Sequence, residues 1–212
     1  MTTSNSFLVG KYAETLWSGS GAIAMLTDTA LKVAVVDLDV IGLAVTAATN
    51  ASPSVITTAT HGMAVGDRAY CQGALGNTAI NGLFTINTAP SGTTFSFANM
   101  DGTVVAGNGT WTSGGRILKL DAIQFYSDIS AGVIGTPVAM ATSGRSTTGG
   151  LFKGPLTTLL SVPTGTTTEL VALYKDTGTA GTSPVIGFMV GSLTTDGNNV
   201  AVSAPNGWLS LT

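Results

Sequence analysis

The sequence predicts an all-β protein, and three features of its composition lead to that prediction. Of the 212 residues, 44% are hydrophobic and only 9% are charged, against about 25% charged in ordinary soluble domains. Threonine, valine and isoleucine suit pleated strands, whereas Lys, Glu, Arg and Gln, the usual residues of exposed helices, are scarce. The 28 glycines stand with Asn, Asp, Ser and Pro between short apolar runs, which is the pattern of turns between strands.

The N-terminal segment, residues 1–20, sets apolar side chains among Ser, Thr and Gly with neither a helical nor a strand period. We therefore expect an extended N-terminal arm. Aromatic residues in such an arm bury a large area each, so they either cap the chain's own core or reach a neighbouring subunit. The interface candidates are Phe7, Leu8, Tyr12, Leu16 and Trp17.

The first compact elements begin with residues 31–37, a valine-rich run that predicts a strand buried on one or both faces. From Leu43 the composition changes to short strands separated by turn signals, which predicts a small β-barrel or meander. Its expected strands are VITTAT, RAYCQG, GLFTIN and TFSFAN. We expect a further hairpin over residues 101–115, which contain Trp111.

The second half of the chain is also rich in strand patterns. We expect strands in RILKLDAIQFYSDI, TPVAM, LTTLLSV, ELVALYKD, SPVIGFMV, NNVAVSA and GWLSLT. Within residues 170–190 a strand, a polar loop and a strand follow one another. The turn residues of that loop are Asp176, Gly178, Gly181, Ser183 and Pro184, and the loop contains no catalytic grouping.

Groups capable of nucleophilic or metal chemistry are few and isolated. The chain has one histidine, His61, and one cysteine, Cys71. A catalytic Cys–His pair needs a third orienting group, and none is recognisable. We interpret the histidine as a turn residue beside Gly62 and the cysteine as a small buried hydrophobe. Asp37 and Asp39 are too few ligands for a calcium loop, so we expect a solvated strand end.

Two further functional hypotheses depend on pairs of residues in the inner part of the chain. Hydrolysis of a polysaccharide would need two carboxylates at a defined separation, and Asp67 with Asp101 is the one thin candidate. A sugar site would need exposed aromatics, for which Trp111 with Tyr70 or Phe84 is available. We expect no catalytic, cofactor-binding or metal-binding residue.

Charge and hydropathy give expectations about partners. A net charge of −3 with the basic residues scattered singly leaves no footprint for nucleic acid. No run approaches the roughly 18 apolar residues of a membrane span. The start of the chain lacks a signal-peptide pattern, which predicts synthesis in a cytoplasm. So few charges favour association with other protein surfaces.

Two interleaved sets of segments resemble proteins of tailed bacteriophages. The outer set resembles virion structural proteins of the head decoration or cement kind; it comprises LKVAVVD, FYSDI, YKDTG with a following TSP and apolar strand, and the C-terminal PNGWLSL. The inner set resembles a small β module found as an insert in phage head and tail proteins; it comprises THGMAVGD and GNTAINGLFTIN. That module is named for its likeness to the FCCH half-domain of ubiquitin-activating enzymes, a name that concerns fold and carries no activity.

The interleaving implies two domains. Residues 1–41 with 120–212 would form a discontinuous β-sandwich host domain, and residues 42–119 an inserted small β domain, because insertions into exposed loops are well tolerated.

The resemblance also implies a function. The chain would be a non-enzymatic capsid decoration or cement protein on the outer capsid surface of a virion, with the major capsid protein and copies of itself, as a homotrimer, for partners. The alternatives are a neck, tail or fibre protein of the virion and, with less support, a carbohydrate-binding virion module.

Overall fold

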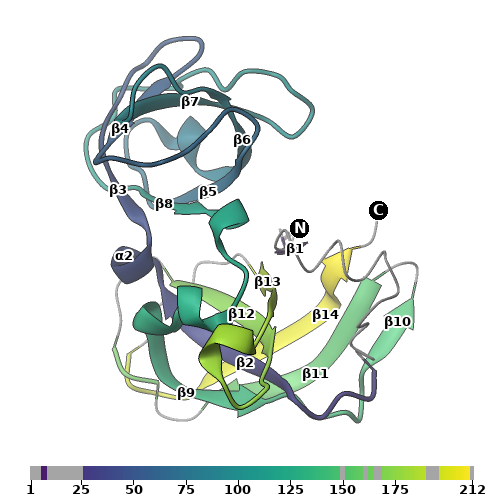
Figure 1. The fold of residues 1–212 in the computed structure, drawn as a ribbon. Helices are drawn as coiled ribbons and strands as arrows, with labels where there is room; N and C mark the ends of the chain where they lie inside the picture. Colours follow the sequence, from purple (N-terminus) through teal and green to yellow (C-terminus); the bar gives the residue numbers. More distant parts are fainter. Residues whose placement is uncertain are drawn as a thin grey trace. The chain divides into compact units, whose positions relative to one another are not determined.

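The structure, a computed structural model, describes residues 6–8, 26–148, 151–159, 162–164, 169–189 and 196–210. Strands dominate this part of the chain, which confirms the all-β prediction (Figure 1). Its one α-helix is the four-residue α2 (Leu38–Ile41). The chain divides into two compact units, Leu38–Ala122 and Met1–Asp37 with Ile123–Thr212. The sequence placed the two boundaries after residues 41 and 119.

The unit Leu38–Ala122, called the barrel unit below, is a closed antiparallel barrel with strand order β3-β4-β7-β6-β5-β8. Its strands are β3 (Leu43–Ala48), β4 (Val55–Thr58), β5 (Arg68–Gln72), β6 (Gly82–Thr88), β7 (Thr94–Ala98) and β8 (Arg116–Lys119). The barrel was predicted, and four strands coincide with the four predicted runs. The order is not that of a simple meander, because β4 pairs with β7 and not with β5, the next strand in the chain. The segment between β4 and β5 separates these two strands.

Aromatic side chains fill the centre of the barrel unit. Phe95 and Phe97 are fully buried, and their ring centroids lie 5.4 Å apart. Phe84 stacks on Phe97 with centroids 4.7 Å apart. Burying rings of this size supplies much of the free energy that holds so small a barrel together.

The two ends of the barrel unit meet at one place. Leu43 pairs with Ile117 and Ala44 with Arg116, so the first and last strands are antiparallel neighbours. An inserted domain must begin and end close together, since both ends continue into one host. An ion pair between Asp39 and Arg116 ties the entering segment to the last strand.

The other unit, called the sandwich unit below, contains two sheets. The first has the order β1-β13-β12-β2-β9 and the second β10-β11-β14. Their strands are β1 (Ser6–Leu8), β2 (Leu31–Asp37), β9 (Val133–Ala139), β10 (Ser146–Thr148), β11 (Leu151–Leu159), β12 (Glu169–Lys175), β13 (Val185–Met189) and β14 (Val200–Ser210). The sheets share one apolar core, which includes Val33, Leu173 and Ile186 of the first and Leu159 and Val202 of the second.

Residues 31–37 form an almost continuous apolar run because both faces of strand β2 are buried. Leu31, Val33 and Val35 belong to the core between the sheets, whereas Ala34 and Val36 face the opposite side and are buried as well. A strand covered on both faces does not alternate between apolar and polar residues.

Two predicted segments have a different local structure. RILKLDAIQFYSDI is a strand only over β8 and continues as the 3-10 turns η2 (Leu120–Ala122) and η3 (Tyr126–Asp128), after which η4 (Ser130–Gly132) follows. The reason is local: the Asp128 carboxylate accepts hydrogen bonds from the amides of Gln124 and Phe125, 2.8 Å each, which closes a turn. The hairpin expected over residues 101–115 has isolated bridges and no regular strand.

The expected N-terminal arm begins as an edge strand. Phe7 pairs with Phe188 and Leu8 with Gly187 in the β1–β13 ladder, so the backbone of these two interface candidates joins the first sheet. Tyr12, Leu16 and Trp17 lie outside the described residues. None of the helices in the described part of the chain could span a lipid bilayer.

Candidate functional site

A hollow of about 300 Å³ lies on the first sheet of the sandwich unit, on the face opposite the shared core. Its floor combines Lys32 of β2 with Tyr174 of β12, which are direct neighbours in the ladder. Tyr126 of η3 stacks on Tyr174 with ring centroids 4.5 Å apart and an interplanar angle of 23°. One wall comes from Thr136 and Pro137 in the edge strand β9.

The opposite wall of the hollow is the loop between β12 and β13, which its own side chains hold in shape. Ser183 accepts a hydrogen bond from the Thr177 amide at 3.0 Å and donates one to the Thr179 carbonyl at 2.8 Å. The Asp176 carboxylate accepts from the Gly178 amide at 2.8 Å. Such a network fixes a loop in one conformation, so the hollow is formed before any ligand arrives.

The charges at the hollow cancel each other. Lys32 and Asp176 form an ion pair of 2.6 Å, with about a third of each side chain exposed. The Lys32 hydrogen bond lowers the pKa of Asp176, so this carboxylate stays ionised. Partial burial, followed by the nearby Asp176 charge, raises the pKa of Tyr126, and burial raises that of Tyr174. Both phenols are therefore neutral donors near neutral pH.

The sequence interpretation treated the segments of this hollow separately and did not predict that they meet. Lys32 belongs to LKVAVVD, Tyr126 to FYSDI, and Tyr174, Asp176 and Gly178 to YKDTG. The feature of the sequence that could have pointed to the hollow is that all three segments carry polar or aromatic residues inside otherwise apolar strand patterns.

The barrel unit holds a second organised set of polar side chains, around Asn77. This side chain is fully buried and donates to the Thr49 carbonyl and the Ser54 hydroxyl, both at 3.0 Å. It also accepts from the Asn108 amide at 3.2 Å. Three loops far apart in sequence are therefore joined by one amide, which the sequence analysis did not single out. Beside it, a Cβ on Gly76 would lie 2.0 Å from the Thr110 carbonyl oxygen.

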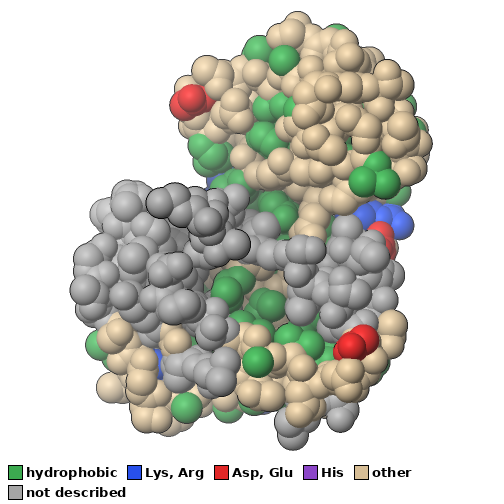
Figure 2. All heavy atoms as spheres, turned by 180° about the vertical axis from the view of Figure 1, so that it is seen from behind, with side chains coloured by type: hydrophobic (Ala, Val, Ile, Leu, Met, Phe, Trp, Pro, Cys, Tyr) green, Lys and Arg blue, Asp and Glu red, His purple; other side chains and the backbone are tan. Residues whose placement is uncertain are grey.

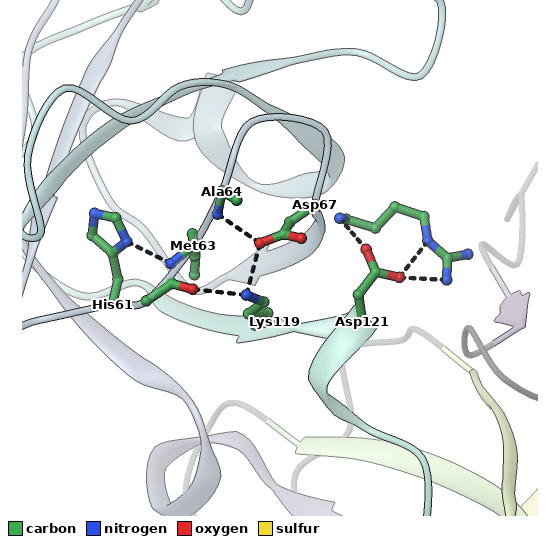
Figure 3. Close-up of polar contacts among 8 residues, drawn as sticks. His61, Met63, Ala64, Asp67, Lys119 and Asp121 are labelled. Atoms are coloured by element: carbon green, nitrogen blue, oxygen red, sulfur yellow. Dashed lines mark hydrogen bonds and ion pairs between the residues drawn. The ribbon is translucent and has the colours of Figure 1, made fainter.

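His61 lies at the start of the segment that crosses from β4 to β5 (Figure 3). Its Nδ1 accepts a hydrogen bond from the Met63 amide at 2.9 Å, and its ring meets Phe95 edge to face at 4.9 Å. Its buried Nε2 has no hydrogen-bond partner among the described residues. Gly62 beside it has φ 58°, which is the left-handed conformation that favours glycine. These contacts give the histidine a packing role.

Asp67, at the end of the segment between β4 and β5, and Lys119 of β8 hold this segment in place (Figure 3). The Asp67 carboxylate accepts from the Ala64 amide at 2.6 Å and pairs with the Lys119 ammonium at 2.7 Å. Lys119 also donates to the Gly62 carbonyl at 2.8 Å. Lys119 therefore fastens both ends of the segment between β4 and β5 to β8, through the Gly62 carbonyl and the Asp67 carboxylate.

The residue pairs that the sequence suggested for catalysis or sugar binding do not form joint sites in the structure. Cys71 is fully buried, and burial raises the pKa of its thiol to about 12. Asp101 is engaged by the amide and hydroxyl of Thr103, apart from the Asp67 network. Tyr70 and Phe84 are both buried, so neither joins Trp111 in an exposed aromatic platform.

The expectation of a solvated strand end is wrong for Asp37, because this residue is only 7% exposed. Asp39 belongs to the ion pair with Arg116. Groups of three or more side chains suited to holding a metal ion are not found in the part of the chain that the structure describes.

Every basic residue of the barrel unit is paired within that unit. Its three basic residues each pair with an aspartate: Arg68 with Asp121, Arg116 with Asp39, and Lys119 with Asp67. The Arg68 guanidinium contacts Asp121 through two nitrogens, at 3.0 and 2.7 Å. Figure 2 shows the result on one face, where uncharged atoms cover most of the barrel unit.

Comparison with protein-family models gives no match for this chain, and comparison with curated proteins gives no relative. The class that the structure itself defines is a two-unit all-β protein in which a closed barrel interrupts a β-sandwich.

The Asp67–Lys119 pair gives the barrel unit a predictable response to acid. Burial tends to raise the pKa of Asp67, but hydrogen bonds from Lys119 and the Ala64 amide outweigh it and leave the pKa below its usual value. A lowered folded-state pKa stabilises the fold above the unfolded value of about 3.9, and this contribution is lost as the pH falls through the folded pKa.

We expect acidification from about pH 6 to about pH 3 to lower the free energy of local unfolding of the segment between β4 and β5 by up to about 1 kcal/mol. The effect is limited to this size because the ion pair is partly exposed. Amide hydrogen exchange of residues 62–67, corrected for intrinsic rates, measures this. Asp67→Asn should lack most of that acid dependence. An unchanged dependence in this variant would show that the pair contributes nothing.

Proposed function

We propose that the chain is a non-enzymatic structural protein of a tailed-bacteriophage virion, seated on the outer surface of the capsid as a decoration or cement protein. The observation that supports this best is the barrel unit: a closed fold, inserted at a single place, whose basic residues are all paired internally. A surface of this kind favours contact with other proteins through shape and neutral hydrogen bonds. The resemblance of the outer and inner segments to phage virion proteins points the same way.

The proposed partners are the major capsid protein and further copies of the chain, arranged as a homotrimer. Interfaces that exclude charged residues from their centre bind through apolar contact and hydrogen bonds. On a lattice, many modest contacts act together and give a high overall affinity. A charge-poor β protein is therefore suited to covering a repetitive shell, where each contact is made many times.

The N-terminal segment is the proposed contact with neighbouring subunits. Its strand β1 has only three residues and lies at the edge of the first sheet, so the segment is joined to the sandwich by a short ladder. Phe7, Leu8, Tyr12, Leu16 and Trp17 are the interface candidates in this proposal. Aromatic residues in such segments supply large contact areas.

A neck, tail or fibre protein of the virion is the alternative in the same class. The number of copies in each particle separates the two, because a capsid lattice offers many equivalent sites and a tail or neck ring offers few. Quantifying the chain against the major capsid protein in purified particles therefore tests the proposal.

A further inference from the structure

We propose that the hollow on the sandwich unit, formed around Lys32, Tyr126, Tyr174 and Asp176, binds one unit of a neutral saccharide. This inference concerns a different part of the molecule from the Trp111 region, where the sequence allowed a sugar site. It does not rest on the proposed place in the virion, since the purified chain can be tested alone.

The size and rigidity of the hollow suit a small ligand. Its volume of about 300 Å³ lies at the lower end of the range of small-molecule sites. The Ser183 and Asp176 hydrogen bonds hold one wall in place, and the stacked tyrosines form another side. A ligand that enters loses little free energy to ordering the protein.

The polar groups of the hollow select for a neutral, hydroxyl-rich ligand. Because Lys32 and Asp176 neutralise each other at 2.6 Å, a charged ligand would have to disrupt this pair. Each partner still has hydrogen-bonding capacity, since an ammonium has three donors and a carboxylate has about four acceptor sites. Such a pair can donate to one sugar hydroxyl and accept from its neighbour. The phenols of Tyr126 and Tyr174 add neutral donors.

The aromatic side chains supply the apolar part of the recognition. Tyr174 is 3% exposed and serves as backing, whereas Tyr126 is only half-buried and lines the hollow. A pyranose presents C–H groups on one face and hydroxyls around its edge, so it needs an aromatic surface beside polar groups.

A peptide ligand fits the hollow less well. Peptides that add to a sheet use an unpaired strand edge. Strands β2 and β12, which form the floor, are each paired on both sides, and Lys32 and Tyr174 stand on their face. The edge strand β9 lines the hollow with Thr136 and Pro137, and a proline has no amide hydrogen to donate to an added strand. A shallow site lined by hydroxyls and one neutralised ion pair also lacks the apolar groove that an amphipathic helix requires.

The test is a titration of the purified full-length chain with methyl α-glucoside, methyl β-galactoside, N-acetylglucosamine, maltose and lactose. Amide chemical shifts in NMR spectra report both affinity and position. We expect at least one of these sugars to bind with a Kd on the order of 1 mM or tighter. The shifted amides should cluster at residues 176–183 and near Tyr126.

Two variants and a matched control assign the binding to the hollow. Tyr126→Phe keeps the ring and removes its hydroxyl, and Lys32→Met with Asp176→Asn removes both charges together; each should weaken binding about tenfold or more. The control is Lys175→Met with Asp28→Asn, which removes the neighbouring 2.8 Å ion pair of the same unit outside the hollow. It should leave the Kd unchanged.

Three outcomes overturn the proposal: none of the five sugars binds, the shifts lie elsewhere, or the hollow variants bind as tightly as the control. A peptide from a capsid protein that binds at these residues while no sugar does would likewise replace it. These results leave the copy-number test untouched, so a failure here is distinguishable from a failure of the proposed virion role.

Discussion

Phe95→Ala is expected to destabilise the barrel unit by about 3–5 kcal/mol, the usual cost of removing a buried phenylalanine ring. Phe95 is fully buried, lies 5.4 Å from the Phe97 ring and 4.9 Å from the His61 ring, and so supports both the core and the crossing segment. The loss combines the transfer of apolar surface to water with the cavity left behind. Amide hydrogen exchange followed by mass spectrometry measures it in peptides of β4, β6 and β7.

The matched control for this change is Leu75→Ala, because Leu75 is in the same unit and is 56% exposed. A surface substitution of this kind changes stability by no more than about 0.5 kcal/mol. Equal protection in the Phe95→Ala protein and the wild type would show that the barrel does not depend on its aromatic centre.

Asn77→Ala is expected to cost about 2–3 kcal/mol, the upper part of the usual cost of disrupting the hydrogen bonds of a buried polar group. The change removes hydrogen bonds to the Thr49 carbonyl, the Ser54 hydroxyl and the Asn108 amide. Asn77→Asp should cost more, because it also places a charge at a position with no solvent exposure. Chemical denaturation followed by NMR of the barrel amides measures both.

Asn108→Ala is the matched control for the Asn77 variants. Asn108 is an exposed residue of the facing loop, and its side chain makes two hydrogen bonds, to the Ala79 amide and the Thr78 hydroxyl. Water replaces these bonds at low cost, so its loss should be within about 1 kcal/mol. If the Asn77 and Asn108 variants lost equal stability, the buried amide would not be the group that joins the loops.

Much of the fold could be predicted from local pattern. The runs that became β4 to β7 are short and β-rich, and glycine or asparagine turns bound them. The strand order could not be predicted in this way, because it depends on where the segment between β4 and β5 runs. The hydrogen bonds that hold that segment join His61 and Asp67 to residues distant in sequence.

The sites were harder to predict than the strands, because they depend on contacts between distant residues. Lys32 and Asp176 are 144 positions apart in the sequence and meet because β2 and β12 are neighbours. The burial of Asn77 follows from three loops closing over it. The turn residues of the 170–190 segment identified its loop, but only the sheet register brings Tyr174 beside Lys32.

If the chain covers the capsid of a phage particle as we propose, its amount relative to the major capsid protein in purified virions must reflect that position. Quantitative mass spectrometry with labelled standards gives the ratio, and immunogold labelling of intact particles gives the position. We predict a ratio set by the capsid lattice, with label over the outer shell. A small copy number confined to the neck or tail, or absence of the chain from washed particles, would contradict the account.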